Sequence, residues 1–271
     1  MNCEQNTVSL NGFEMDYCCF GNGNTPVVIL PGIRLMPVTP MAALIAKQYS
    51  AFCDDYKVYL FDRKRKIEDG YTMEQMSDET AAAMESLGIA GACLMGCSQG
   101  GIMAQHIAAT HPHLVSKLVL CSTAASVTPT ATEALGNWDR LACEGDVQAF
   151  NHEVFTRIYS ADYYAKNLTA FTYAEKVGNA EDFAHFLPLL RTMNGLDNRS
   201  LLKQIACPTL VIGSSIDNVL GPESSPELAS LLGCELIMYE NYGHALYDEA
   251  PAEVQSHILA FFETTQHPFG D

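Results

Sequence analysis

Short runs of apolar residues, each bounded by turn-forming residues, recur along the chain. Because successive positions in them are apolar, both faces of each run are expected to be buried, which is typical of strands in a parallel sheet. These runs lie at residues 27–30, 58–61, 93–95, 118–120, 210–212 and 236–239. Residues 7–19 instead predict an antiparallel hairpin, because the pair Asn11-Gly12 separates two strand-like segments.

Segments with helical periodicity separate most of these strands. They lie at about residues 40–53, 73–88, 99–110, 226–232 and 251–264. Strands that alternate with helices predict an α/β fold, a mostly parallel sheet with helices on both faces. The alternation stops between residues 123 and 203, where helical patterns occur at about 131–144, 146–159, 161–176 and 180–192. We therefore predict a core of residues 1–122 and 204–271, with a helical cap or lid, residues 123–203, inserted before the last strands.

A G-x-S-x-G sequence, Gly96-Cys97-Ser98-Gln99-Gly100, lies between a predicted strand and a predicted helix. A serine on such a sharp turn projects its hydroxyl above the sheet, and the flanking glycines avoid collisions with neighbouring backbone. The N–H groups at the start of the helix favour negative charge that develops nearby. An incidental glycine-rich turn is the alternative, but the context of strand, turn and helix favours Ser98 as a nucleophile.

A serine nucleophile needs a base to take its proton, and the chain has eight histidines. His244 lies between the last predicted strand and the last helix, at the carboxyl end of the sheet, where ligands bind in open α/β folds. His106, on the helix after Ser98, is interpreted as a packed helix residue. Asp217 follows a predicted strand and is the predicted partner of His244, although an aspartate in a loop also commonly caps a turn. Asp248, four residues after His244, leads into the last helix and is explained by helix capping and by the helix dipole.

The chain order Ser, Asp, His is the order of the catalytic residues in the α/β-hydrolase fold. The sequence resembles that superfamily, specifically its compact single-cap esterase and lactonase-like members, from Pro31-Gly32 through the Ser98 motif to His244. The resemblance implies an oxyanion loop that begins at Pro31-Gly32, where members usually carry His-Gly. It also implies that the backbone N–H groups of Ile33 and Gln99 form the oxyanion hole.

This constellation predicts a serine hydrolase that cleaves a small carboxylic ester, lactone or thioester through an acyl-enzyme on Ser98, with His244 as base and Asp217 orienting it. A C–C bond hydrolase, an enol-lactonase, a peptidase or a cofactor-free perhydrolase on the same triad stays an alternative. A non-catalytic ligand receptor on a hydrolase scaffold is a more remote one. Trp138, in the predicted cap, and Arg34, next to the oxyanion loop, are candidates for contact with the substrate.

The charge balance narrows the choice of partners. The chain carries 15 Lys and Arg residues against 32 Asp and Glu residues, which gives a net charge of −17. Such an excess of acidic residues disfavours nucleic acid and anionic membrane surfaces as partners. Four basic residues nevertheless lie together at Arg63-Lys64-Arg65-Lys66. This cluster is interpreted as part of a solvated loop, with attraction of an anionic substrate as the alternative.

The remaining patterns argue against several classes of protein. The ten cysteines are scattered and form no C-x-x-C pair, so free thiols and a cytoplasmic location are expected. No segment resembles a signal peptide or is apolar for long enough to cross a membrane. Metal-ligand spacings such as H-E-x-x-H are absent, and no metal or other cofactor is expected. The expected partner is a small-molecule substrate, and a homodimer is left open.

Overall fold

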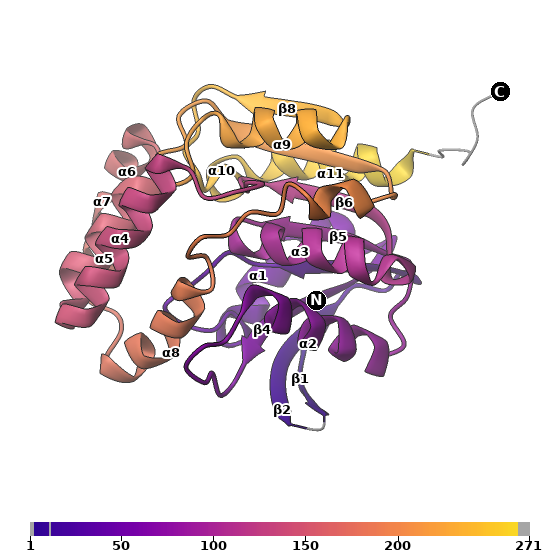
Figure 1. Ribbon diagram of the computed structural model, residues 1–271, viewed down its shortest axis with the longest axis horizontal. Helices are drawn as coiled ribbons and strands as arrows, with labels where there is room; N and C mark the ends of the chain where they lie inside the picture. The colour runs from indigo at the N-terminus through magenta and orange to yellow at the C-terminus, as the bar shows by residue number, and fades with distance from the viewer. Residues whose placement is uncertain (1–2, 11, 265–271) are drawn as a thin grey trace.

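The computed structural model describes residues 3–10 and 12–264 of the chain. Within these residues, eight strands form one sheet in the order β1-β2-β4-β3-β5-β6-β7-β8 (Figure 1). The strands are β1 (Cys3–Leu10), β2 (Phe13–Phe20), β3 (Thr25–Leu30), β4 (Tyr56–Lys64), β5 (Ala92–Cys97), β6 (Val115–Cys121), β7 (Thr209–Ser214) and β8 (Glu235–Tyr239). Each predicted strand is present, and β3 to β8 are parallel to one another, as their apolar runs predicted.

The hairpin predicted near the start of the chain is also confirmed. Strands β1 and β2 are antiparallel, with Leu10 opposite Phe13, and β2 pairs in turn with β4. Gly12 has a φ of 102°, which glycine adopts readily in a tight turn, whereas Asn11 lies outside the described residues.

Helices cover both faces of the sheet, because successive strand residues point to opposite faces and are apolar on both. On one face, α2 (Met73–Ser86), α3 (Gln99–Thr110) and α9 (Ser224–Leu232) pack in a core that contains Val28 and Leu30. On the other face, α1 (Ala42–Gln48) and α11 (Pro251–Glu263) pack in a second core that contains Val27 and Ile29. The predicted fold class, an α/β fold with helices on both faces, is therefore confirmed.

Some helix boundaries differ from the prediction. The segment expected as one helix over residues 40–53 is α1 flanked by two short 3₁₀ turns, η1 (Thr39–Met41) and η2 (Ser50–Phe52). Two further 3₁₀ turns, η3 (Pro112–Leu114) and η4 (Leu201–Gln204), precede β6 and β7. A one-turn helix that was not predicted, α10 (Leu246–Glu249), precedes α11.

Between β6 and β7 the chain forms helices that stand beside one end of the sheet (Figure 1). They are α4 (Pro129–Glu144), α5 (Val147–Ile158), α6 (Ala161–Lys166), α7 (Leu168–Ala174) and α8 (Ala180–Arg191). The helix expected over residues 161–176 is divided at Asn167, whose side-chain Nδ2 donates to the Tyr163 carbonyl at 2.9 Å and closes α6. We call residues 129–191 the helical insertion; the exact limits of a separate cap domain stay a prediction.

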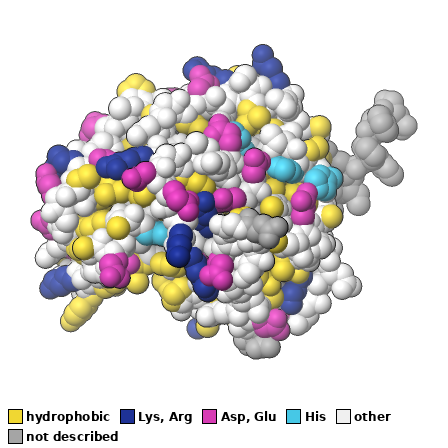
Figure 2. All heavy atoms as spheres, turned by 60° about the horizontal axis from the view of Figure 1, so that its bottom comes forward, with side chains coloured by type: hydrophobic (Ala, Val, Ile, Leu, Met, Phe, Trp, Pro, Cys, Tyr) yellow, Lys and Arg dark blue, Asp and Glu magenta, His cyan; other side chains and the backbone are white. Residues whose placement is uncertain are grey.

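Charges of both signs are mixed on the face of the molecule shown in Figure 2, where Lys and Arg side chains lie among Asp and Glu side chains. No helix in the described part of the chain is long and apolar enough to cross a membrane. None of the ten cysteines, all of which are described, forms a disulfide bond.

Candidate active site

The candidate residues meet at one edge of the sheet because they all follow the carboxyl ends of parallel strands. The loop that begins at Pro31 follows β3, and Ser98 follows β5. Asp217 follows β7, and His244 follows β8. This edge is where ligands bind in open α/β sheets.

Ser98 occupies the tight turn between β5 and α3. Its backbone has φ 51° and ψ −122°, a conformation that costs a non-glycine residue about 1–3 kcal/mol and that clusters at functional sites. Two hydrogen bonds hold the turn, from Ser98 N to the Cys121 carbonyl (3.0 Å) and from Thr123 Oγ1 to the Ser98 carbonyl (2.8 Å). A Cβ atom at Gly100 would collide with the carbonyl oxygens of Leu30 and Pro31, so the close approach of the end of β3 and the loop after it requires the second glycine of the motif.

His244 and Asp217 form a buried hydrogen-bonded pair. The distance from His244 Nδ1 to Asp217 Oδ2 is 2.8 Å, and both residues are less than 5% exposed. The other carboxylate oxygen of Asp217 accepts the backbone N–H groups of Val219 (2.8 Å) and Leu220 (2.9 Å). Burial alone would raise the pKa of Asp217, but the charge and hydrogen bond of His244 and these two N–H groups outweigh it, so the pKa lies below its ordinary value. The carboxylate is thus held ionised and fully hydrogen-bonded against the imidazole.

The loop after β3 passes directly beside Ser98. A Cβ atom built on Gly32 would lie 3.1 Å from Ser98 Cβ, so a larger residue there would crowd the serine. Ile33 follows Gly32, and Gln99 is the first residue of α3, so its N–H has no carbonyl one turn earlier in the helix to bind. The two N–H groups predicted for the oxyanion hole therefore lie on the two segments that flank Ser98.

Arg63 and the side chain of Gln99 connect these two segments. Arg63 Nη2 donates to the Pro31 carbonyl at 2.8 Å and to Gln99 Oε1 at 3.1 Å. Gln99 Nε2 donates to the Leu189 carbonyl of α8 at 2.8 Å and to Thr192 Oγ1 at 3.3 Å. The oxyanion loop, the Ser98 turn and the helical insertion are thus joined through two side chains. The sequence analysis did not place either side chain in the site.

The interpretation of the basic cluster at residues 63–66 as a solvated loop is wrong for Arg63 and Lys64 and holds for Arg65 and Lys66. Arg63 and Lys64 belong to β4, which continues further than the apolar run predicted. Lys64 is buried, and its Nζ binds Glu79 Oε1 at 2.9 Å. Arg65 and Lys66 follow the strand and are both exposed, and Arg65 binds the carboxylate of Asp16.

Asp248 caps no helix, contrary to the expectation from its position. Neither α10 nor α11 has a side-chain cap. The Asp248 carboxylate instead accepts Gln48 Nε2 at 3.3 Å and the Tyr159 hydroxyl at 3.2 Å. Burial raises the pKa of Asp248 above its ordinary value, although both hydrogen bonds and the charge of Arg34 act in the opposite direction. Asp217 and not Asp248 is bonded to His244, as the sequence analysis predicted.

The loop that carries His244 is attached to the helical insertion. Ala245 N donates to the Ile158 carbonyl, at the end of α5, at 2.7 Å. Glu249 Oε1 accepts both Gly243 N and Ser160 N at 2.8 Å. A Cβ atom on Gly243 would lie 2.7 Å from the Ile158 carbonyl oxygen, so this close contact requires glycine. Sequence reasoning did not identify these contacts, because nothing in the spacing of residues 158–160 and 243–249 marks them as neighbours.

The two residues expected to contact substrate occupy different environments. Arg34 is exposed, and its Nη2 lies 3.9 Å from Met41 Sδ. Trp138 of α4 is 4% exposed and packs in the core that also contains Val28, while its Nε1 has no hydrogen-bond partner among the described residues. Both assignments stay predictions. His106 is confirmed as a packed helix residue, buried and hydrogen-bonded through Nε2 to Asn198 Oδ1 at 3.1 Å.

Comparison with known proteins identifies the family. A family model described as the alpha/beta hydrolase fold matches residues 25–251. The match covers most of the chain. The protein therefore belongs to the alpha/beta hydrolase family and is a hydrolase.

Curated relatives and solved structures resemble the chain over most of its length. A protein of Serratia proteamaculans named "Putative carbamate hydrolase RutD" is 28% identical over 209 residues, 73% of this chain and 78% of that protein. A protein of the same name from Pantoea ananatis is 25% identical over 226 residues, 79% of this chain and 82% of that protein. An alpha/beta hydrolase from a Medee basin deep-sea metagenome library has a TM-score of 0.86 at 23% identity, covering 98% of this chain and 100% of that one. The enol-lactonase of Burkholderia xenovorans has a TM-score of 0.84 at 23% identity, and the match covers 96% of this chain and 100% of that one.

No group of three His, Cys, Asp or Glu side chains in residues 3–10 and 12–264 is arranged to hold a metal ion.

Proposed function

We propose that this hydrolase is a serine hydrolase that forms an acyl-enzyme on Ser98. The observation that carries the proposal is the buried pair of His244 and Asp217, which lies at the same edge of the sheet as the strained Ser98 turn. A histidine held in this way by a carboxylate is the base that a serine hydroxyl needs.

Each residue has a role in the proposed reaction. The N–H at His244 Nδ1 donates a hydrogen bond to Asp217, and Nε2 is then unprotonated and able to take the proton of Ser98. The Ser98 oxygen attacks the substrate carbonyl, and the negative charge on the carbonyl oxygen is stabilised by the N–H groups of Ile33 and Gln99. His244 then returns the proton to the leaving group, and a water molecule activated in the same way hydrolyses the acyl-enzyme.

The proposed substrate is a small carboxylic ester, lactone or thioester, because each presents a carbonyl carbon with a departing oxygen or sulfur. A carbamate is a second candidate, which the names of the curated relatives support. The enol-lactonase likeness is one of fold, so enol-lactone and C–C bond cleavage, peptide hydrolysis and perhydrolysis stay alternatives on the same triad. We propose that the helical insertion acts as the cap that selects among such substrates, with Arg34 and Trp138 as substrate contacts.

A comparison of two serine variants tests this proposal. Ser98→Ala is expected to lower kcat for p-nitrophenyl acetate by at least about 10⁴-fold and to abolish labelling by a fluorophosphonate probe. Ser122→Ala is the matched control, because Ser122 also follows a strand, is buried, has a positive φ of 46° and has no hydrogen-bond partner for its hydroxyl among the described residues. A probe adduct on a residue other than Ser98, or equal losses in the two variants, would show that Ser98 is not the nucleophile.

A substrate panel tests the proposed class. Turnover of p-nitrophenyl esters, aliphatic lactones, thioesters, N-substituted carbamates and short peptides by the wild-type protein ranks the candidates by kcat/KM. The highest value is expected for an ester, lactone or thioester. A higher value for a carbamate or a peptide would move the assignment to that class and leave the role of Ser98 intact.

A further inference from the structure

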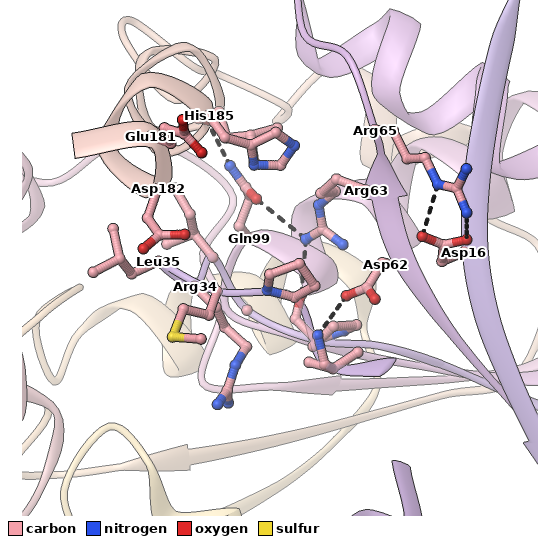
Figure 3. A pocket seen from close by; sticks show the side chains of 17 residues that line it. Asp16, Arg34, Leu35, Asp62, Arg63, Arg65, Gln99, Glu181, Asp182 and His185 are labelled. Atoms are coloured by element: carbon pink, nitrogen blue, oxygen red, sulfur yellow. Dashed lines mark hydrogen bonds and ion pairs between the residues drawn. The ribbon is translucent and has the colours of Figure 1, made fainter. Parts of the chain in front are cut away.

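A cavity of about 220 Å³ lies beside the oxyanion loop. Its walls are residues 31–38 of that loop, Asp16 of β2, the end of β4 with Arg65 after it, Gln99, and one face of α8 from Glu181 to Leu189 (Figure 3). Ser98, Asp217 and His244 are not among the residues that line it, so the cavity is adjacent to the candidate triad but distinct from it. A volume of 220 Å³ equals that of about seven water molecules in the liquid, which is room for a carboxylate on a short chain.

Arg63 presents unused hydrogen-bond donors in this cavity. Both of its hydrogen bonds, to Pro31 and to Gln99, leave from Nη2. Its Nε is buried without a partner and has no surface that a ligand in the cavity can reach, whereas Nη1 makes no hydrogen bond to any described residue and is the donor open to a ligand. No carboxylate among the described residues lies within ion-pair distance of the guanidinium. Burial lowers the pKa of Arg63 to about 10, and the more distant charge of Asp62 offsets only part of that effect. A half-buried guanidinium without a paired carboxylate loses part of its solvation, and a bound anion would offset that cost.

Most of the carboxylates that line the cavity form hydrogen bonds or ion pairs with groups other than Arg63. Asp16 binds Arg65, with 2.7 Å between Oδ1 and Nη2. Asp62 accepts the N–H groups of Val38 (2.6 Å) and Thr39 (3.0 Å). Two further acids line the wall formed by α8. Asp182 there accepts Asn179 N at 2.8 Å, and Glu181 is exposed at the rim.

Arg34 also lines this cavity, but its side chain takes a different direction from that of Arg63. In Figure 3 the Arg34 side chain extends away from Arg63 and Gln99. Its charge instead acts on Asp248 and Tyr159, which lie where the insertion meets the loop of His244. The charges of the two arginines therefore act on different surroundings, Arg63 on the loop and Gln99, and Arg34 on Asp248 and Tyr159.

We infer that this cavity binds a carboxylate carried by the substrate, with Arg63 as the residue that recognises it. The inference rests on the proposed function, and it narrows the substrate class to esters whose acyl group ends in a carboxylate, that is, monoesters of short dicarboxylic acids. Because Arg63 also holds the Pro31 carbonyl and Gln99, an occupied cavity fixes the loop that carries the predicted oxyanion donors.

The first experiment measures binding without catalysis. Titration calorimetry of glutarate into the Ser98→Ala protein is expected to show binding that Arg63→Gln weakens by about tenfold or more. Lys66→Gln is the matched control, because it removes a positive charge from the same segment without touching the cavity, and it should leave binding unchanged. This readout does not depend on the nucleophile, so it separates a failure of this inference from a failure of the proposed function. Glutarate that does not bind, or that binds equally to the Arg63→Gln protein, would overturn the inference.

The second experiment measures selectivity. The ratio of kcat/KM for p-nitrophenyl hemiglutarate to that for p-nitrophenyl valerate compares an anionic and a neutral acyl group of equal length. The wild-type ratio is expected to exceed one, to fall about tenfold or more in Arg63→Gln and to recover in part in Arg63→Lys, which keeps the charge. Loss of the oxyanion loop's support would lower both rates equally and leave the ratio unchanged.

Three outcomes of the selectivity experiment would overturn the inference. The first is a wild-type ratio at or below one, a result that needs no variant and so does not depend on whether Arg63→Gln folds. The second is an unchanged ratio in a folded Arg63→Gln protein, which would make Arg63 a positioning residue only. The third is a ratio that falls in Arg34→Gln and not in Arg63→Gln, which would put the carboxylate on the other side of the loop.

Discussion

Asp217 and Asp248 are both enclosed by protein, but their surroundings shift their pKa values in opposite directions. The His244 charge and two backbone N–H groups surround Asp217, so its ionised form is favoured. Asp248 receives two longer hydrogen bonds from neutral groups, Gln48 and Tyr159, and burial dominates. Only the first carboxylate is arranged to stabilise an imidazolium.

The first prediction compares the two aspartates in catalysis. Asp217→Asn should lower kcat by about 10⁴-fold, because an amide favours the wrong tautomer of His244. Asp248→Asn should lower kcat by less than about tenfold, because Asp248 does not contact His244 within hydrogen-bond distance. Steady-state kinetics on a neutral ester measures both. A larger loss of kcat in Asp248→Asn than in Asp217→Asn would show that Asp248, and not Asp217, orients His244.

The second prediction concerns stability and pH at Asp248. The raised pKa means that the folded protein binds this proton more tightly than the unfolded chain does. The wild-type protein should therefore gain stability relative to Asp248→Asn as the pH falls from neutral towards about 4, the ordinary aspartate value. Urea unfolding of both proteins at several pH values measures the difference, in which all other titrating groups cancel. A difference that is constant, or that changes in the other direction, would contradict the raised pKa.

The residues of the candidate triad could be predicted because each depends on local sequence. Ser98 has its motif, and Asp217 and His244 follow apolar strand runs, which places them at the same edge of the sheet. Arg63, Gln99 and Asp248 could not be assigned in this way. Their partners lie from 32 to 200 residues away in the sequence, and only the folded chain brings them together.

At the scale of elements, the end of α5 packs directly on the loop that carries His244. The contact depends on a hydrogen bond between backbone groups and on the absence of a side chain at Gly243. The sequence predicted α5 and the strand before His244 separately. It could not predict their contact, because neither an N–H to carbonyl bond nor a close approach of two backbones leaves a mark in side-chain periodicity.

The third prediction follows from this contact. Gly243→Ala should destabilise the protein by about 1–3 kcal/mol, because the new methyl group must displace the backbone of residues 158–160. Gly136→Ala is the matched control. Gly136 lies in α4 with open space around its Cα, so alanine there should stabilise the protein by about 0.5–1 kcal/mol. Urea unfolding measures both changes, and a neutral result for Gly243→Ala would show that the loop and α5 separate easily.

At the scale of the whole molecule, the net charge of −17 opposes the approach of any anion, including the dicarboxylic monoesters inferred above. This repulsion acts over long distances, where salt screens it, whereas Arg63 acts at contact distance inside a cavity. The charge of the surface and the charge of the cavity wall thus act at different stages of binding.

The fourth prediction uses this difference in range. Raising the ionic strength from about 0.01 M to about 0.15 M shortens the screening length from about 30 Å to about 8 Å. The value of kcat/KM for p-nitrophenyl hemiglutarate should therefore rise severalfold, while that for the neutral valerate ester should stay nearly constant. Initial-rate measurements of p-nitrophenol release at matched pH give kcat/KM for the two esters. An anionic ester whose kcat/KM falls with added salt would show that attraction, not repulsion, controls its encounter with the protein.

The hydrogen bond from Ala245 N to the Ile158 carbonyl also makes the motion of the helical insertion measurable by amide hydrogen exchange. That amide hydrogen can exchange with deuterium in the solvent only when the helical insertion moves away from the residue next to His244. Amide hydrogens in the middle of β5, by contrast, exchange only when the sheet itself opens. The ratio of the two exchange rates therefore reports how often the insertion separates from the core while the sheet stays folded. If ligands enter by that separation, its frequency sets an upper limit on turnover.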